Sequence, residues 1–213
     1  MHENIFHLVV GPISTNCWIY RYNENRAAII DPGDEAEKII SALYKNSLTP
    51  EFILLSHGHF DHIGAAAKLT AAFPEMIKIA IHREDAKYIG KDSAAIQKES
   101  LRAAMGDDSL LDILWHETPE ADIILEEGSD VGPFTVLHTP GHSSGSVCFF
   151  DKIANVLFSG DTLFYRGYGR TDLPDSDNNQ MTESLRRLFA MDEEITVYPG
   201  HGRKTTIGKE KIQ

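Results

Sequence analysis

The sequence predicts an α/β (α+β) fold in which two β-sheets pack together and helices cover their outer faces. Short apolar runs bounded by glycine, proline and aspartate recur in both halves of the chain, and such runs are typical of buried strands. Segments with apolar residues at helical spacing flank the strands in each half. Two packed sheets with helices outside would bury both kinds of apolar surface. At 213 residues, the chain is predicted to form a single domain, residues 1–213.

In the first half, strands are predicted at residues 5–10, 17–20, 27–30, 52–55 and 77–81. Residues 35–48 carry apolar side chains at helical spacing, with Asp34 as a candidate cap. Residues 63–73 form an alanine-rich predicted helix that Pro74 ends. Residues 83–120 are more polar, interrupt this order and include a predicted helix at 93–105. We interpret residues 83–120 as a lid-like insertion over one edge of the core.

The second half repeats this order of elements. Strands are predicted at residues 134–138, 146–150, 156–159 and 195–198. A helix is predicted at about residues 180–191, with Leu185, Leu188 and Phe189 on one face. Each of these strands leads into a loop that contains glycine or aspartate.

The composition excludes several classes of partner. Lysine and arginine number 20 against 32 aspartates and glutamates, a formal net charge of −12. Such a chain is not expected to bind nucleic acid or an anionic membrane in general, because both need basic patches. The N-terminal stretch lacks the pattern of a secretory signal, and no apolar run approaches 18 residues. We therefore expect a cytoplasmic protein, with Cys17 and Cys148 as buried free thiols.

The strongest chemical signal is Ser56-His57-Gly58-His59-Phe60-Asp61-His62, directly after the apolar run at residues 52–55. His57 and His59 are two positions apart, which in extended backbone places both side chains on the same face. Asp61 and His62 follow as the chain turns toward the next helix. Imidazole nitrogens and carboxylate oxygens suit zinc, manganese or iron. The segment thus offers two pairs of metal ligands.

Three further candidate ligands, His142, Asp161 and His201, stand where predicted strands end in glycine-containing loops. His57, His59 and His142 can form one three-histidine site, and Asp61, His62 and His201 can form a second. The Asp161 carboxylate can bridge the two. Two metals about 3.5–4 Å apart can share a hydroxide, and coordination lowers the pKa of bound water to about 7. Two divalent ions, with zinc first and iron or manganese as alternatives, are therefore expected.

Four motifs together resemble the metallo-β-lactamase superfamily: HGHFDH at 57–62, TPGHSSGS at 139–146, SGDTLF at 159–164 and PGHG at 199–202. The resemblance implies an αββα sandwich of two mixed sheets with a dinuclear site at one edge. It also implies the ligand assignments given above, with Asp61 orienting the hydroxide. Asp31, in Ile30-Asp31-Pro32-Gly33, matches a position that steadies the metal site in this family.

Within the superfamily, the stretch GDTLFYRGYGRTDLP at 160–174 is most similar to the glyoxalase II-like short hydrolases. This resemblance implies hydrolysis of a thioester such as S-lactoylglutathione by a metal-bridging hydroxide, and so a small thiol-derived substrate. Arg170 matches a basic glutathione contact of glyoxalase II, whereas Asp172 and Arg203 stand where that enzyme tends to have tyrosines. The chain is also expected to lack the C-terminal helical domain of glyoxalase II. Arg170, Tyr168 and Arg203 are the candidate substrate contacts.

Other activities stay open at this point. The Gly-Arg-Thr-Asp segment at 169–172 also resembles the persulfide dioxygenases, which implies one iron held by His57, His142 and Asp161. Lactone or phosphodiester hydrolysis could use the same hydroxide. A metal-bound redox or scaffold protein is a third class. Common zinc β-lactamases have a cysteine at the position of Asp161, which argues against antibiotic hydrolysis.

Overall fold

The computed structural model describes residues 4–74, 76–114 and 116–211. Met1, His2 and Glu3, which belong to the N-terminal stretch used for the localisation prediction, lie outside the described residues. Among the helices that the structure describes, none has both the length and the apolar character needed to cross a bilayer.

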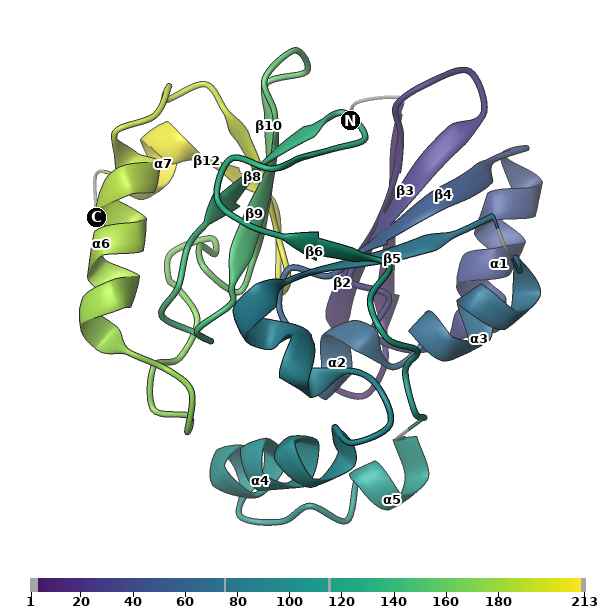
Figure 1. Ribbon diagram of the computed structural model, residues 1–213. Coiled ribbons are helices and arrows are strands. Elements are labelled where there is room, and N and C mark those ends of the chain that lie inside the picture. Colours follow the sequence, from purple (N-terminus) through teal and green to yellow (C-terminus); the bar gives the residue numbers. More distant parts are fainter. Residues whose placement is uncertain (1–3, 75, 115, 212–213) are drawn as a thin grey trace.

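Two mixed six-stranded sheets form the centre of the molecule (Figure 1). The first has the spatial order β1 (Ile5–Val10), β2 (Thr15–Arg21), β3 (Arg26–Ile30), β4 (Thr49–Leu54), β5 (Lys78–His82) and β6 (Ile123–Leu125). The second has the order β12 (Thr205–Thr206), β11 (Thr196–Pro199), β10 (Val156–Gly160), β9 (Val147–Asp151), β8 (Phe134–His138) and β7 (Asp130–Val131). β3 to β6 run parallel, as do β10 and β11, and the other neighbours are antiparallel.

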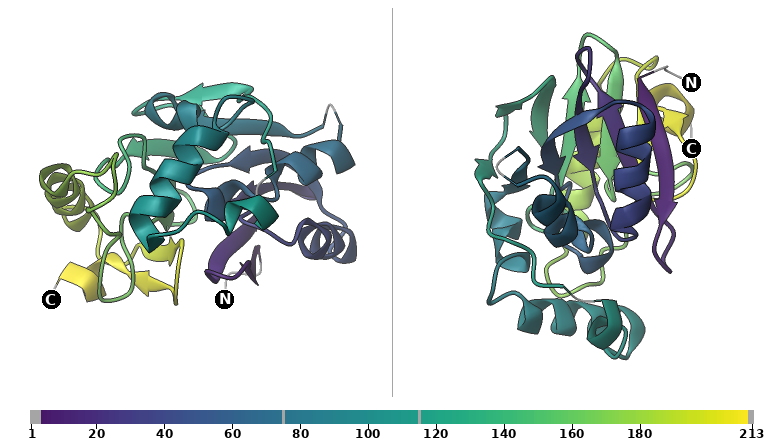
Figure 2. Two further views of the ribbon diagram at one scale, coloured as in Figure 1. Left: turned by 90° about the horizontal axis from the view of Figure 1, so that it is seen from below. Right: turned by 90° about the vertical axis from the view of Figure 1, so that its right-hand side faces the viewer.

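Helices cover both outer faces of the pair of sheets. α1 (Ala36–Lys45) and α3 (Ala66–Ala72) lie against the first sheet, and α6 (Asn178–Phe189) and α7 (Ile207–Lys211) against the second (Figures 1 and 2). Three buried apolar clusters separate the four layers, the central one between the sheets. Because side chains alternate along a strand, Ile53 of β4 packs toward the helices and Leu54 packs between the sheets. These layers confirm the predicted sandwich of two mixed sheets.

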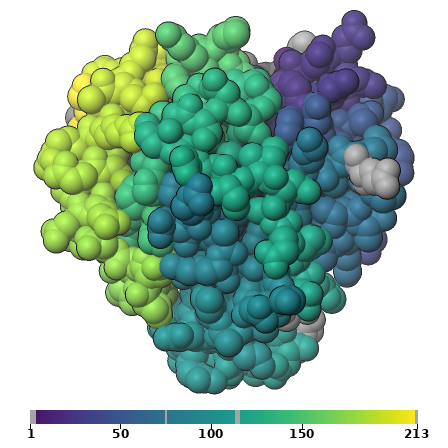
Figure 3. All heavy atoms as spheres, viewed as in Figure 1, coloured from purple at the N-terminus to yellow at the C-terminus, as the bar shows by residue number. Residues whose placement is uncertain are grey.

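Residues 83–120 lie between β5 and β6 and contain a 3₁₀ helix η1 (Arg83–Tyr88), α4 (Ala94–Met105) and α5 (Leu111–Leu114). Figure 1 shows α4 and α5 beyond one end of the strands, and in Figure 3 this teal segment forms the lower part of the visible surface. The segment thus occupies one edge of the sandwich. Its role as a lid stays a prediction.

Two local predictions were wrong. The helix expected at 63–73 is divided into α2 (Phe60–Ile63) and α3, because the chain between them contacts the Pro32–Gly33 turn: the Ala65 N–H donates to Pro32 O at 2.9 Å. Asp34 does not cap α1. Glu35 occupies the capping position in a left-handed conformation (φ 54°), and Asp34 Oδ1 accepts from the Glu35 N–H.

Candidate metal centre

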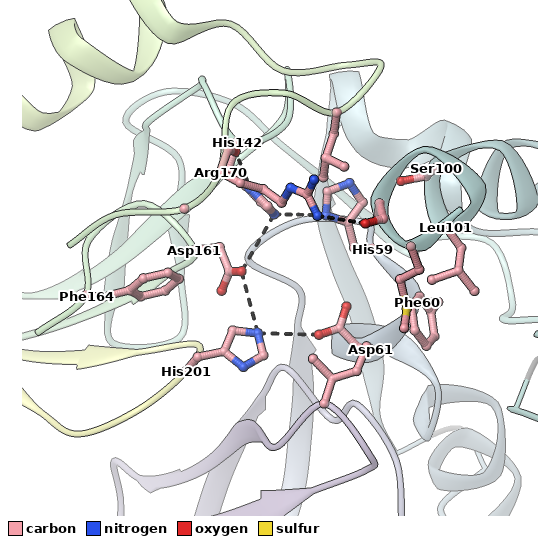
Figure 4. Close-up of a pocket in the computed structure, with 15 residues that line it drawn as sticks. His59, Phe60, Asp61, Ser100, Leu101, His142, Asp161, Phe164, Arg170 and His201 are labelled. Atoms are coloured by element: carbon pink, nitrogen blue, oxygen red, sulfur yellow. Dashed lines mark hydrogen bonds and ion pairs between the residues drawn. The ribbon is translucent and has the colours of Figure 1, made fainter. Parts of the chain in front are cut away.

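The predicted metal ligands come together at one end of the two sheets, and Figure 4 shows His59, Asp61, His142, Asp161 and His201 among them. The carboxyl ends of parallel neighbours meet at the same edge of a sheet, which brings the loops after β10 and β11 together. His57 and His59 follow β4, Asp61 and His62 lie in α2, His142 lies between β8 and β9, Asp161 follows β10 and His201 follows β11. The Val147 N–H donates to Ser56 O at 2.8 Å and so joins the two sheets beside the site.

Three buried histidines form the first group of candidate ligands. His59 Nδ1 and His142 Nε2 are 2.9 Å apart, and one ligand atom from each of His57, His59 and His142 lies within 4.8 Å of the others. The His57 ring is nearly perpendicular to the other two, with ring centroids 4.8 Å apart in both cases. The three rings thus direct nitrogens toward a common point.

Asp61, His62 and His201 form the second group, and Asp161 lies between the groups. His62 Nε2 is 3.3 Å from His201 Nε2 and 3.5 Å from Asp61 Oδ2. Asp161 Oδ1 lies 3.5 Å from His62 Nε2, and Asp161 Oδ2 lies 3.6 Å from the Nε2 atoms of both His142 and His201. One carboxylate therefore contacts both groups, as a bridging ligand would.

The spacing and the chemistry of these donors fit two divalent ions. Ligand bonds of about 2.0–2.1 Å in tetrahedral geometry place ligand atoms roughly 3.3 Å apart. The neighbouring ligand atoms are separated by 2.9 Å at the shortest and 3.6 Å at the longest of the quoted pairs. His57 Nε2 is buried and has no hydrogen-bond partner among the described residues. Burying a polar atom without a partner is costly, and a metal ion at this point would remove that cost.

Electrostatics in the first group favours the form of histidine that binds metals. Burial and the neighbouring imidazoles hold the pKa values of His57 and His59 well below the usual range. Both rings are therefore neutral at pH 7, and a neutral imidazole has a free lone pair for a metal.

The second group is a network of opposite charges in the protein without metal. Burial opposes ionisation of His62, but Asp61, Asp161 and Asp31 outweigh it and raise the pKa of His62 to about 10. Burial likewise opposes ionisation of Asp61, and the His62 and His201 rings outweigh it, so the pKa of Asp61 is lowered. A divalent cation bound here would replace the His62 proton and take its place as the positive partner of the Asp61 and Asp161 carboxylates.

Asp31 contacts residues beside or within both ligand groups: Ser56, which precedes His57, and His62. Its Oδ1 accepts from the Ser56 N–H at 2.8 Å and its Oδ2 from Ser56 Oγ at 2.7 Å, while Oδ2 also lies 3.0 Å from His62 Nδ1. Asp31 has a positive φ of 52°, which aims it at this position. A carboxylate on the far nitrogen of a metal-binding histidine fixes the ring orientation. Asp31 thus contacts both ligand segments, and its role in steadying a metal site stays a prediction.

Gly200 is required by a close approach beside the bridging carboxylate. A Cβ atom at this position would lie 2.3 Å from Asp161 Oδ1 and 2.7 Å from His62 Cε1. Any larger residue would therefore displace two candidate ligands.

Two buried residues of the insertion support the ligand loops and were not found from the sequence. Asp85 in η1 accepts from the Gly58 N–H at 2.8 Å, from Ser143 Oγ at 2.7 Å and from the Gly145 N–H at 2.7 Å. Burial raises the pKa of Asp85 despite these hydrogen bonds. Gln97 in α4 donates to Gly58 O at 2.6 Å. The peptide between His57 and His59 is thus held on both sides, and no motif in the sequence distinguishes these residues from surface polar residues.

A pocket of about 430 Å³ opens over the candidate ligands. Metal-ligand residues form part of its lining, and the rest comes from Ile13, Phe60, Ser100, Leu101, Ala104, Met105, Phe164, Gly169, Arg170 and Leu173. A pocket of this size can enclose a small organic substrate beside the metal ligands.

Of the predicted substrate contacts, Arg170 lines this pocket. Tyr168 is 52% exposed and borders a different hollow, beside α6. The Arg203 guanidinium lies 3.6 Å from the centroid of the Tyr165 ring. The roles of Tyr168 and Arg203 in substrate binding stay predictions.

Comparisons with known proteins agree with this architecture. Hydroxyacylglutathione hydrolase GloC of Haemophilus influenzae is 35% identical over 210 residues, which cover 98% of this chain and 95% of that protein. The crystal structure of BLEG-1 B3 metallo-beta-lactamase has a TM-score of 0.84 at 35% identity and covers 98% of this chain and 97% of its own. TTHA1623 in a di-iron-bound form has a TM-score of 0.82 at 37% identity and covers 96% of both chains.

A family model covers most of the chain. Residues 10–201 match the model of the metallo-beta-lactamase superfamily, a range that contains all seven candidate ligands. This match confirms the resemblance inferred from the four motifs. The chain therefore belongs to the metallo-β-lactamase superfamily.

Proposed function

We propose that this protein is a metal-dependent hydrolase that cleaves thioesters of small thiols. The observation that carries the proposal is the pair of three-residue ligand groups that share the Asp161 carboxylate beneath a pocket. The relative of nearly the same length named as a hydroxyacylglutathione hydrolase supports the thioester as substrate. The acidic composition of this chain supports a small-molecule substrate rather than nucleic acid.

Two divalent ions held by these residues would lower the pKa of water and polarise a substrate carbonyl. Within the chain, Asp61 Oδ2 accepts a hydrogen bond from Thr15 Oγ1 at 3.0 Å, which fixes the carboxylate that is to orient the attacking water. Both cysteines are fully buried, so neither is available as a nucleophile. A thiolate is a good leaving group because thiol pKa values lie near 8.5, so little general acid is required.

The test measures metal content and thiol release on the same preparation. Wild-type protein is expected to bind two divalent ions and to release thiol from S-lactoylglutathione. Asp161→Ala is expected to lose most of its metal and activity, whereas Asp130→Ala, an exposed aspartate on β7, is expected to keep both. A fully loaded and fully active Asp161→Ala protein would contradict the proposal.

β-Lactam hydrolysis is the second candidate, because a structure with a TM-score of 0.84 is named a B3 metallo-beta-lactamase. A panel with a chromogenic cephalosporin, a lactone and a phosphodiester separates these hydrolases. Oxygen consumption with glutathione persulfide identifies the iron-dependent alternative. Whichever substrate has the highest kcat/KM decides the class.

A further inference from the structure

One wall of the pocket is the inner face of α4. Gln97, Ser100, Leu101 and Ala104 follow the spacing i, i+3, i+4 and i+7, so they share one face of the helix. The first three are buried, and Ser100, Leu101, Ala104 and the following Met105 line the pocket. α4 therefore presents mainly apolar groups toward the candidate ligands.

Apart from the candidate ligands and Arg170, the rest of the lining is also apolar. Ile13 lies between β1 and β2, Phe60 begins α2, and Phe164 and Leu173 lie in the connection between β10 and α6; all four line the pocket. Of the described residues in the lining, Arg170 is the only arginine or lysine. The recognition of a charged substrate group in this pocket would therefore depend on Arg170.

The Arg170 guanidinium is already occupied within the chain. Nε donates to Asp172 Oδ1 at 2.6 Å and Nη2 to Asp172 Oδ2 at 2.9 Å, a bidentate pair. Nη1 donates to Ala104 O at 3.1 Å. Figure 4 shows the Arg170 side chain reaching from its loop toward the helix that carries Ser100 and Leu101. The Asp172 carboxylate thus neutralises the positive charge of Arg170, which a substrate carboxylate would need as its partner.

The contact with Ala104 fixes the C-terminal end of α4. Ala104 lies in the last turn of the helix, where carbonyl groups lack helical partners and cations are favoured. Nearer the other end, Gln97 Nε2 donates to Gly58 O at 2.6 Å and to Tyr88 O at 2.9 Å. α4 is thus held to the ligand loop through Gln97 and to the loop after Asp161 through Arg170.

We propose that α4, held by the Arg170–Asp172 pair, is a fixed specificity wall, and that the pocket binds an uncharged, apolar acyl group of a thioester substrate. This inference rests on the proposed thioester hydrolysis. An anionic acyl group would find no unpaired lysine or arginine among the lining residues. Leu101 to Met105 spans about 6 Å along the helix, which an acyl chain of roughly five single bonds covers.

The first experiment varies the length of the acyl chain while the thiol part of the substrate stays the same and carries no charge. N-acetylcysteamine thioesters from acetyl to octanoyl are assayed on the fully metal-loaded protein. We expect kcat/KM to rise about fourfold per methylene, as for a buried CH₂, and to level off near six carbons. Butyryl thioester should exceed succinyl thioester at least tenfold. A flat series, or a preference for succinyl, would overturn the inference.

The second experiment removes the Arg170–Asp172 ion pair by changing either partner, with Arg170→Gln and Asp172→Asn. The pair is partly exposed, so the protein should fold without it. We expect both variants to flatten the chain-length series and to increase hydrogen exchange in α4. If Arg170 instead binds a substrate carboxylate, Arg170→Gln will lower activity only on anionic thioesters, and Asp172→Asn will raise it. Arg186→Gln, which breaks an exposed pair on α6, is the matched control.

A third variant places a new charge at the pocket. Met105 is 60% exposed and lines the pocket, so Met105→Lys should fold and put an ammonium group beside the acyl group. We expect the succinyl-to-butyryl ratio of kcat/KM to rise about fivefold, the effect of roughly one exposed ion pair. Met76→Lys, at an exposed methionine outside the pocket lining, should leave the ratio unchanged. An unchanged ratio in Met105→Lys would overturn the assignment of this wall.

These outcomes separate the two proposals. If the metal-loaded wild-type protein hydrolyses no thioester, the proposed function falls and takes this inference with it. If it hydrolyses glutathione and acetyl thioesters without any dependence on acyl length or charge, the proposed function stands and only the inference about the pocket falls.

Discussion

Replacing Asp85 by asparagine tests how the insertion supports the candidate metal centre. The Asp85 carboxylate accepts three hydrogen bonds, from the Gly58 N–H, Ser143 Oγ and the Gly145 N–H, and is fully buried. Asp85→Asn keeps the shape of the side chain but puts an amide NH₂ where one oxygen accepted. At least one backbone N–H must then face another donor.

The magnitude follows from two opposing contributions. Losing a hydrogen bond to a charged group costs about 1.5–3 kcal/mol, and the N–H left without a partner costs about 1–3 kcal/mol. The neutral amide is easier to bury, as the raised pKa of Asp85 indicates, and this offsets part of the loss. We expect the free energy of unfolding to fall by roughly 2–3 kcal/mol, which lowers Tm by about 5–10 °C.

In Asp85→Asn, the affinity for metal is expected to fall more at the first ligand group than at the second. Gly58 lies between His57 and His59, and Ser143 follows His142, so the first ligand group depends directly on Asp85. Supporting contacts of this kind typically change metal affinity 10- to 100-fold. When Asp85→Asn is dialysed against increasing concentrations of chelator, it should therefore lose the ion of the first ligand group before the other ion.

Urea unfolding of the metal-free protein measures the stability change, and mass spectrometry of the dialysed samples measures metal content. Asp92→Asn, an exposed aspartate of the same insertion, is the control and should match the wild type in both. If Asp85→Asn retains both ions as tightly as the control and unfolds at the same urea concentration, Asp85 does not position the ligand loops.

Two further substitutions and one thiol-reactivity measurement test other buried contacts. Asp31→Asn should weaken metal binding about 10- to 100-fold in chelator competition, because the His62 ring loses its partner at Nδ1, while unchanged affinity would exclude that role. Gly200→Ala should reduce metal content and activity together, because its Cβ would meet Asp161, and a fully loaded variant would refute the clash. Burial raises the pKa of Cys148 to about 11, so this thiol should react with a disulfide reagent only after urea unfolds the protein; prompt reaction in the native state would contradict its burial.

The sequence indicated which histidines and aspartates lie close together because their signal is local. Histidine and aspartate at the ends of apolar strands can be recognised from the strands themselves, and parallel neighbours then bring the ends together. The same reasoning located most strands, since residues 27–30 of β3 and residues 53–54 of β4 are buried and belong to short apolar runs. The outcome was a correct sandwich, with the candidate ligands close together in space.

Features that depend on tertiary contacts could not be predicted in this way. The two-residue strands β7 and β12 are too short to show a periodicity, and they exist through pairing with β8 and β11. Asp85 and Gln97 look like ordinary polar residues of an insertion, and their partners are backbone groups that any sequence would offer. Arg170 was identified, but its hydrogen bond to Ala104 O depends on where α4 lies.

The insertion contacts both the loop that carries two candidate ligands and the pocket above them. Gln97 holds Gly58 between two candidate ligands, and three and four residues later Ser100 and Leu101 line the pocket. A displacement of α4 would therefore move the substrate wall and disturb the ligand loop in the same step. Because Asp85 also holds the Gly58 peptide, the loop keeps one support when the other is lost. Gln97→Leu should thus alter acyl-chain selectivity more than metal content, whereas Asp85→Asn should do the reverse.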